Sequence, residues 1–548
     1  MKIKNICRFF FLLLIIMFIR VSGFAQSADI IFTNGKIFTA DERQRYVQAL
    51  AIRGNKILAT GTNAMIEKLA SAKTKRIDLN GKTVVPGFND QHDHAAFEFS
   101  AAPLTFDHIV FSVEGLVKAA VLDSIARLLV YAKPGQWMEG KIGTNVFFDT
   151  SMRRSLDSIA PNNPVLLQVA WGHGIVTNQK GLAAAGLSDT LKDPVGGWYE
   201  RNSDGKISSV QQNAQAPFWI AVNVTNPHSI ISSMEEFGQE QLRGGITSTL
   251  FMGGGFTHSL ATSTLQNANI PQRLRIVAWP RSTPEGRQVS EWPVAETHPS
   301  STSTISGIKY CIDGTPFEGN SLRSKPYHHR GNGNGRLNYP VDTLRQMMRE
   351  ALATKRQLLM HITADSSFGI VLNLIKETGT AAQWLPLRIR IEHNDVGNPT
   401  KEQRKVLKDY GIMMMHTPKY AFGSPLRSLL NNGILVGIAP DGTTNPFWDI
   451  MVIASQQANP IENLTREQAV IAYTKTNALA EFKEKEKGTL MHGMLADLAV
   501  LSQDIFTIPS QQLPATKSVL TMIDGKIVYE HTPQRKASTQ HEVTVAQP

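Results

Sequence analysis

Residues 83–94 read TVVPGFNDQHDH, a short apolar run that is followed by polar residues. His92 and His94 lie two residues apart. Because side chains alternate across a β-strand, both imidazoles would point to the same side of such a strand. Two imidazoles on one side can bind a single metal ion. The stretch therefore predicts a buried strand with the start of a metal site at its end.

Seven more short β-rich runs follow, separated by longer amphipathic stretches, and this alternation is typical of a parallel sheet. They are ITSTLFMG (246–253), LRIVAWP (274–280), GIKYCIDG (307–314), LLMHIT (358–363), RIRIEH (388–393), IMMMHTP (412–418) and ILVGIAPD (434–441). Eight such units predict an α/β chain with a TIM (β/α)8 barrel over residues 85–484. The segment 101–227 is too long for a loop, so it predicts an insertion over the barrel mouth, where substrate-selecting loops lie.

The two ends of the chain have a different pattern. Residues 28–41 and 49–61 alternate apolar runs with Asn-Gly and Gly-Asn breaks, and residues 496–508 and 518–530 repeat that style. Such patterns are typical of short antiparallel hairpins. We expect residues 26–84 and 485–530 to share one small β-sandwich. The polar residues 531–548 have too few apolar side chains to fold and are expected to form a flexible tail.

The first 25 residues resemble a secretory signal peptide. Three basic residues precede an apolar run at 9–19, and small residues end near Ala25. The run is shorter than the ~20 residues that a membrane span needs. We therefore expect cleavage, export to the periplasm or the medium, and no stable membrane anchor afterwards. Outside this segment Cys311 is the only cysteine, which excludes an intrachain disulfide in the mature chain.

The charge pattern argues against a nucleic-acid partner. The formal net charge is +10, and removal of the signal segment would leave +6. Basic residues are scattered and matched by acids, as in EFKEKEKG at 481–488. A small-molecule substrate is the expected partner, and a homo-oligomer is compatible with the sequence.

Further metal-ligand residue types lie at the ends of the predicted barrel strands. His361 ends the fifth run, His393 the sixth and Asp441 the eighth. A single histidine is usually a hydrogen-bonded core residue, but four histidines and an aspartate at matching strand ends are hard to obtain by chance. The active site of a TIM barrel lies at this face of the sheet. These residues are therefore candidate ligands of one or two divalent ions.

Lys309 lies inside the apolar fourth run, where a buried ammonium needs a partner. One solution is an ion pair with Asp313. The other is reaction with carbon dioxide to a carbamate, a carboxylated lysine whose oxygens could bridge two ions ~3.5 to 4 Å apart. We place the carbamate ahead of the ion pair.

Several motifs resemble the amidohydrolase superfamily, and more narrowly the YtcJ-like or amidohydrolase-3 branch that includes N-substituted formamide deformylase. They are GFNDQHDH, KYCIDGT, RIRIEHND, APDG, DPVGGWYERNSDGK and the closing GTLMHGMLADLAVLSQD. The resemblance covers nearly the whole mature chain. It implies a distorted TIM barrel beside a β-sandwich from both termini, and a mononuclear or binuclear metal site that is most often zinc.

By motif position, the resemblance assigns the metal ligands to residues that the barrel pattern also selects. They are His92, His94, His361, His393 and Asp441, with Lys309 at the place of the carboxylated lysine. The implied reaction is hydrolysis of a non-peptide carbon–nitrogen bond by metal-activated hydroxide. Asp441 would accept and return the proton, while His393 and His173 would stabilise the oxyanion. His173 and Asn178 are the expected substrate-binding residues of the insertion.

The chain also departs from that branch. Where the branch commonly has a glutamate in a segment resembling GVLQENA, this chain has SSVQQNA with Gln212, which cannot act as a carboxylate. Two alternatives therefore stay open beside amide hydrolysis. One is the same metal barrel acting on a lactone, a phosphoester or a deaminated ring, and the other is a binding protein that keeps the fold without catalysis.

Overall fold

The computed structural model describes residues 27–94, 113–328, 333–393, 396–420 and 423–531, and the backbone alone of residues 104–106. The predicted signal peptide and almost all of the predicted tail lie outside this range. Within it, no helix is both long and apolar enough to cross a membrane.

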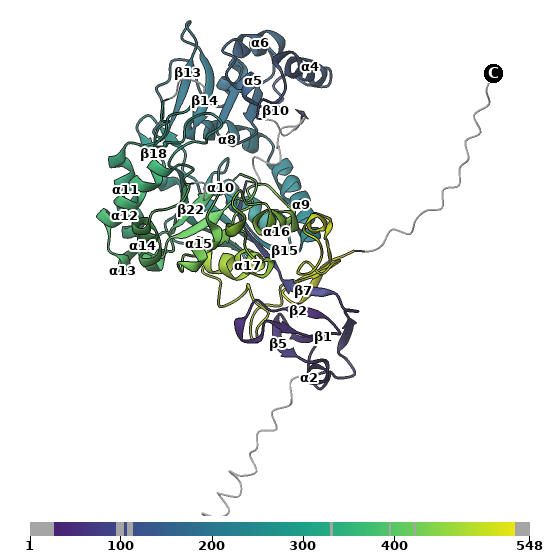
Figure 1. The fold of residues 1–548 in the computed structure, drawn as a ribbon. Helices are drawn as coiled ribbons and strands as arrows, with labels where there is room; N and C mark the ends of the chain where they lie inside the picture. The colour runs from purple at the N-terminus through teal and green to yellow at the C-terminus, as the bar shows by residue number, and fades with distance from the viewer. Residues whose placement is uncertain are drawn as a thin grey trace, which may run out of the picture.

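A parallel barrel occupies the centre of the molecule (Figure 1). Its eight parallel strands follow the order β24-β23-β22-β21-β20-β16-β15-β8. They are β8 (Phe88–Asp93), β15 (Ile246–Met252), β16 (Arg273–Ala278), β20 (Ser303–Cys311), β21 (Leu358–His361), β22 (Arg390–His393), β23 (Met413–His416) and β24 (Val436–Ile438). The barrel is nearly closed, because the backbone amide of Asp441, just after β24, donates to the carbonyl of His92 at the end of β8 over 2.8 Å. The predicted fold class is confirmed.

Amphipathic helices cover the outside of this barrel. They are α9 (Pro227–Gly244), α10 (His258–Asn267), α11 (Val341–Thr354), α12 (Asp365–Thr378), α14 (Lys401–Asp409), α15 (Leu426–Asn431), α16 (Pro446–Ser455) and α17 (Arg466–Ile471). Their apolar faces pack on the strands, with Phe368 and Val371 of α12 beside Met360 and Ile391 of the sheet in one core. The burial of these faces supplies the main driving force for the barrel.

The first predicted strand is in fact two strands. Residues 83–94 divide at Gly87 into β7 (Thr83–Pro86), which pairs with terminal strands, and β8 of the barrel. A Cβ at Gly87 would lie 2.2 Å from Oγ1 of Thr247, so only glycine fits this transition. Every residue of both strands is buried, so no exposed position marks the change of sheet in the sequence.

Two sheets form the terminal module at one end of the barrel. The first has the order β5-β4-β1-β6 and the second β27-β26-β25-β7-β2-β3. The strands are β1 (Ile30–Thr33), β2 (Lys36–Phe38), β3 (Tyr46–Val47), β4 (Ala49–Arg53), β5 (Lys56–Gly61), β6 (Lys75–Asp78), β25 (Leu498–Leu501), β26 (Ser518–Ile523) and β27 (Lys526–Glu530). Phe32 and Leu50 of the first sheet share a core with Val84 and Leu498 of the second.

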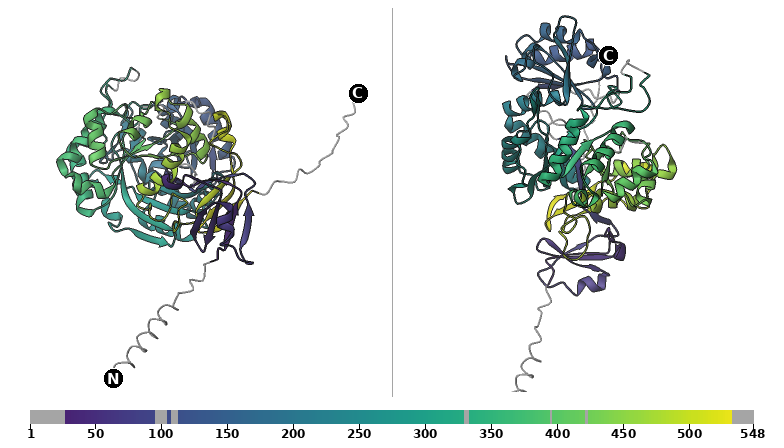
Figure 2. Two further views of the ribbon diagram at one scale, coloured as in Figure 1. Left: turned by 60° about the horizontal axis from the view of Figure 1, so that its bottom comes forward. Right: turned by 90° about the vertical axis from the view of Figure 1, so that its left-hand side faces the viewer.

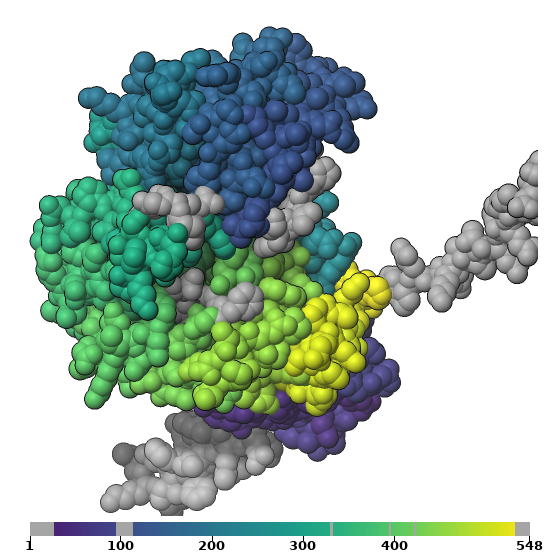
Figure 3. Space-filling view, turned by 45° about the horizontal axis from the view of Figure 1, so that its top comes forward, coloured from purple at the N-terminus to yellow at the C-terminus, as the bar shows by residue number. Residues whose placement is uncertain are grey.

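The insertion lies at the other end of the barrel, so that the three parts follow one another along the molecule (Figure 2, right). Its six-stranded sheet has the order β13-β14-β12-β11-β10-β9. The elements are β9 (Leu104–Phe106), β10 (Met138–Ile142), β11 (Val165–Val169), β12 (Gly174–Thr177), β13 (Gly197–Arg201), β14 (Ile207–Gln212), α4 (Lys118–Leu129), α5 (Thr144–Phe147), α6 (Met152–Ile159) and α7 (Gln179–Ala184). In the space-filling view the insertion (blue) lies against the barrel at the top of the picture (Figure 3).

Candidate active site

Three potential metal ligands converge where β8 and β24 meet. His92 Nε2 lies 3.2 Å from His94 Nε2, and Asp441 Oδ1 lies 3.3 Å from His94 Nε2 and 4.0 Å from His92 Nε2. All three atoms lie within 4.8 Å of one another. Asp441 has a φ of +59°, a strained conformation for a non-glycine residue that is typical of functional sites. This donor set fits one divalent ion.

The tautomer of His92 follows from its partner. Burial lowers its pKa to about 3, so the ring is neutral. Its Nδ1 lies 2.7 Å from Oε2 of Glu392 and must carry the hydrogen that the carboxylate accepts. Nε2 is therefore left with the lone pair that a metal requires.

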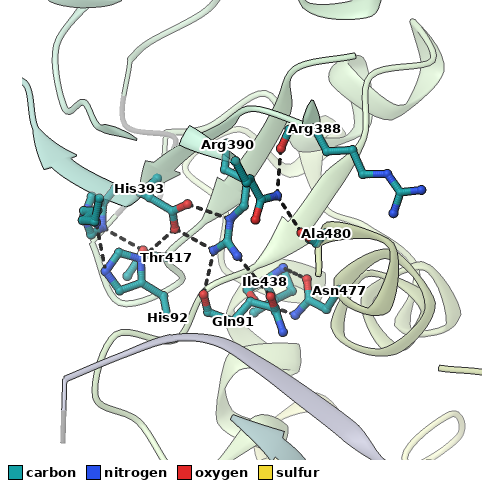
Figure 4. Close-up of polar contacts among 12 residues, drawn as sticks. Gln91, His92, Arg388, Arg390, His393, Thr417, Ile438, Asn477 and Ala480 are labelled. Atoms are coloured by element: carbon teal, nitrogen blue, oxygen red, sulfur yellow. Dashed lines mark hydrogen bonds and ion pairs between the residues drawn. The ribbon is translucent and has the colours of Figure 1, made fainter. Parts of the chain in front are cut away.

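Glu392 is in turn fixed by Arg390. The guanidinium donates to both carboxylate oxygens over 2.8 and 3.0 Å, and it reaches Gln91 beside His92 (Figure 4). Burial would raise the pKa of Glu392, but the Arg390 charge and the hydrogen bond from His92 hold it well below its usual range. Both side chains are completely buried. Glu392 and Arg390 therefore position His92.

We expect Glu392→Gln to weaken metal binding about 10- to 100-fold, because the amide orients His92 less firmly than the carboxylate does. The variant also leaves the buried charge of Arg390 without its carboxylate partner, so the free energy of unfolding should fall by about 3 kcal/mol. Competition with a chromophoric chelator measures the affinity and urea denaturation measures the stability. Glu484→Gln is the matched control, because Glu484 pairs with Arg388 over 2.7 Å at a partly exposed position. Unchanged metal affinity in Glu392→Gln would contradict this role.

His361 and His393 extend the cluster from neighbouring strands. Their ring centroids lie 4.4 Å apart, and those of His92 and His393 lie 4.9 Å apart. Burial holds the pKa of both rings well below the usual value, so they are neutral. Nε2 of His361 donates to the carbonyl of Gly314 over 3.1 Å, which leaves Nδ1 with the lone pair. The structure thus brings all four predicted histidine ligands together.

His173 of the insertion joins the same cluster, with its ring centroid 4.5 Å from that of His361. Burial lowers its pKa to about 4. Its Nδ1 lies 2.9 Å from Oε1 of Gln212, whose Nε2 donates to Glu318 over 3.1 Å. Since Asn338 also donates to that Oε1, His173 carries its hydrogen on Nδ1. Its Nε2 is then an acceptor, which does not suit the expected oxyanion-stabilising role.

Lys309 lies at the base of the site. Its Nζ lies 3.4 Å from Nε2 of His92. Lys309 is only 1% exposed. Burial lowers the pKa of the amine. Asp313, the alternative partner, instead accepts hydrogen bonds from the Thr363 amide over 3.1 Å and from Ser367 Oγ. The geometry therefore does not support the alternative ion pair.

A cavity of about 50 Å³ lies over these residues. The barrel contributes the cluster described above together with Trp279, Cys311, Lys419 and Tyr420, and the insertion contributes Lys141, Gln168, Ala170, Trp171, Gly172 and His173. The Nζ of Lys419 donates to the backbone carbonyl of Asp441. The site is therefore built jointly by the barrel and the insertion.

Asn178 lies outside this cavity, contrary to the expected substrate contact. It is completely buried and precedes α7, where its Oδ1 accepts from the amides of Gly181 and Val165 over 2.9 and 3.1 Å. Its Nδ2 donates to the carbonyls of Ala160 and Asn163. The whole amide is used by the backbone, so Asn178 has a structural role.

Asn178→Ala should lower the free energy of unfolding by about 2 to 4 kcal/mol, because it removes a helix cap and leaves buried backbone groups without partners. Urea denaturation measures the loss. Asn267→Ala is the control, since Asn267 bonds only within α10 at an exposed position. If Asn178→Ala were as stable as the control, the structural role would be contradicted. A raised KM in the folded variant would instead support a contact between Asn178 and the substrate.

A model of the amidohydrolase family matches residues 75–529. The chain belongs to this family. N-substituted formamide deformylase of Arthrobacter pascens is 25% identical to this amidohydrolase, over 92% of the chain and 99% of the relative. Putative amidohydrolase YtcJ of Bacillus subtilis is 25% identical over 91% and 99%. A metal-dependent hydrolase structure from Pyrococcus horikoshii has a TM-score of 0.66 at 18% identity, over 88% and 99% of the chains, and supports the fold.

Several functional residues of this amidohydrolase were not predicted from the sequence. Arg390 and Glu392 alternate with isoleucine in RIRIEH, and charged residues at period two in a buried strand could have indicated a polar network inside the barrel. Lys141, Gln168 and Trp171 carry no comparable signal, because polar residues in an insertion are common. Their position became evident only from the fold.

Proposed function

We propose that this amidohydrolase hydrolyses a non-peptide carbon–nitrogen bond of a small-molecule amide with the help of one or two divalent ions, zinc being the expected metal. The observation that carries the proposal is the convergence of His92 Nε2, His94 Nε2 and Asp441 Oδ1 at the end of the barrel. The names of the relatives, an N-substituted formamide deformylase and a putative amidohydrolase, agree with this bond type.

The donor set suits a metal because its three ligand atoms converge on one position. His92 donates from Nδ1 to Glu392, so its Nε2 faces that of His94 across 3.2 Å without a hydrogen of its own. A bound divalent ion lowers the pKa of water from 15.7 toward ~7 and polarises a carbonyl. His361 would add a further protein ligand, whereas His393 is assigned to the substrate, because a ring nitrogen that binds a metal has no hydrogen to donate.

Asp441 is the proposed proton acceptor. Burial would raise its pKa, but the nearby Lys419 charge and the hydrogen bond with His94 hold it well below the usual value. The carboxylate is therefore ionised at neutral pH and can take a proton from the attacking water. Returning that proton to the departing nitrogen completes the hydrolysis with a neutral amine.

His393 is proposed to orient the acyl oxygen of the substrate. Its Nδ1 lies 3.0 Å from Oγ1 of Thr417, which fixes the plane of the ring. Its φ of +78° turns the side chain into the cavity, at a cost that the surrounding fold must offset. A hydrogen bond to the acyl oxygen that strengthens as charge develops would accelerate the reaction.

Lys309 is proposed to be carboxylated. Addition of its neutral amine to carbon dioxide forms a nitrogen–carbon bond and releases one proton, which yields a carbamate anion. Supporting observations are the burial of Lys309, the lowered pKa of its amine and its distance of 3.4 Å from Nε2 of His92. Intact-protein mass spectrometry under native conditions tests this, with a mass increase of about 44 Da lost in Lys309→Arg.

A substrate panel tests the reaction. The metal-loaded protein is incubated with N-formyl and N-acetyl amines, lactones and phosphoesters, and release of amine is measured. Metal-dependent amine release that exceeds turnover of the other classes supports the proposal. Exclusive turnover of a lactone or phosphoester, or no turnover with bound metal, would overturn it.

A further inference from the structure

One wall of the cavity is a cluster of hydrogen-bond donors from the insertion. β10 and β11 are parallel neighbours, and their register places Lys141 directly beside Gln168. Nζ of Lys141 donates to Oε1 of Gln168 over 3.3 Å. Trp171 follows two residues after β11, and all three side chains line the cavity.

Two of these donors have no acceptor among the described residues. Gln168 is completely buried, and because its Oε1 accepts from Lys141, its Nε2 faces away from that contact with no partner. Nε1 of Trp171 is also buried without a partner. A buried donor without a partner costs about 1 to 3 kcal/mol. Two such donors at the wall of a substrate cavity indicate that their acceptor arrives with the substrate.

The charges around the cavity favour an acceptor that is anionic. The lining contains Lys141, Lys309 and Lys419 but a single carboxylate, that of Asp441. Glu139 lies two residues before Lys141 on the same face of β10, yet it does not line the cavity. Lys141 is therefore the lining cation that the insertion supplies, placed beside two neutral donors.

We propose that Lys141, Gln168 and Trp171 form a carboxylate-binding subsite, so that the substrate is an amide that carries a carboxylate away from the bond to be cleaved. The inference rests on the proposed carbon–nitrogen hydrolysis and specifies its substrate class. An ammonium, an amide N–H and an indole N–H match the lone pairs of two carboxylate oxygens. The barrel would then supply the reaction, and the insertion would select the substrate.

A binding measurement tests the subsite without any turnover. Zinc-loaded protein is titrated calorimetrically with 4-phenylbutyrate and with its neutral amide. We expect the carboxylate to bind at least about tenfold more tightly than the amide, and Lys141→Met or Trp171→Phe to weaken its binding about tenfold. Trp171→Phe keeps an aromatic ring and removes the N–H together with the five-membered ring that carries it. Lys180→Met is the control, because Lys180 is an exposed lysine of α7 in the same insertion.

Since zinc can itself bind a carboxylate, the difference between variants decides the result. Equal binding of 4-phenylbutyrate by wild type, Lys141→Met and Trp171→Phe would overturn the subsite. Thermal denaturation of each variant shows that it is folded, and loss in both folded variants but not in Lys180→Met supports the proposal.

A kinetic measurement separates this inference from the proposed function. N-formylphenylalanine and N-formylphenylalanine amide are compared as substrates. The subsite predicts a higher kcat/KM for the substrate with the free carboxylate than for its amide. In Lys141→Met the ratio of the two kcat/KM values should fall toward one, because KM for the carboxylate substrate rises. Metal-dependent hydrolysis of both at equal kcat/KM would overturn the subsite while leaving the proposed function intact. Carboxylate binding with no hydrolysis of any amide would overturn the proposed function alone.

Discussion

Removal of the metal with a chelator is expected to lower kcat by at least about a thousandfold, because water without a metal ion keeps a pKa of 15.7 and is a poor nucleophile at neutral pH. Re-addition of zinc should restore the activity. The same treatment should lower the melting temperature, since a ligand present at a thousand times its dissociation constant stabilises the folded state by about 4 kcal/mol.

The structural reason for the loss of stability lies in the donor set. Nε2 of His94 lies 3.2 Å from Nε2 of His92 and 3.3 Å from Oδ1 of Asp441, so the folded chain holds three metal-binding groups together. An ion bound by all three links positions that are far apart in the sequence, and the unfolded chain has no such preformed site. Metal binding and the folding of the barrel mouth are therefore expected to be coupled.

His94→Ala tests whether the shift comes from this site. In that variant the chelator should change the melting temperature much less than in wild type. The control is His298→Ala, because His298 is an exposed residue that pairs with Glu296 at the surface. It should retain the full shift. A chelator-induced shift of equal size in His94→Ala would place the metal elsewhere.

The sequence predicts the barrel well because its signal is repetitive. Four of the eight β-rich runs end in predicted metal ligands, and parallel strands bring those ends to one face. His92, His361, His393 and Asp441 therefore meet in the structure although they are spread over 350 positions. A local signal at each strand end was sufficient because the topology is regular.

The predictions that differ from the structure concern contacts that a linear pattern does not contain. Gly87 divides one predicted strand between two sheets, and no exposed position marks this change because every residue of both strands is buried. Asn178, five residues after His173, could equally face a substrate or cap a helix, and its bonds to the backbone of Gly181, Ala160 and Asn163 depend on the fold. Lys141 meets Gln168 through a strand register that the sequence does not reveal.

Asp441→Asn is expected to lower kcat by about 10³- to 10⁴-fold, because the amide keeps the shape of the side chain but cannot accept a proton. The interactions of the backbone are retained, since Lys419 donates to the carbonyl of residue 441 and its amide donates to His92. KM should change far less than kcat, because Asp441 acts on the attacking water. Steady-state kinetics with a metal-saturated preparation measure both constants.

Asp449→Asn is the matched control. Asp449 is completely buried in α16, bonded to Thr443 and Tyr473, and burial raises its pKa to about 7. It does not line the cavity. If the loss of activity came from removing any buried carboxylate near the barrel mouth, both variants would lose activity equally. A large loss confined to Asp441→Asn, with metal content unchanged by elemental analysis, requires proton transfer at residue 441.

Retention of more than a tenth of kcat in Asp441→Asn would instead assign the proton acceptor to another group, and Nε2 of His173 is the acceptor that the geometry offers.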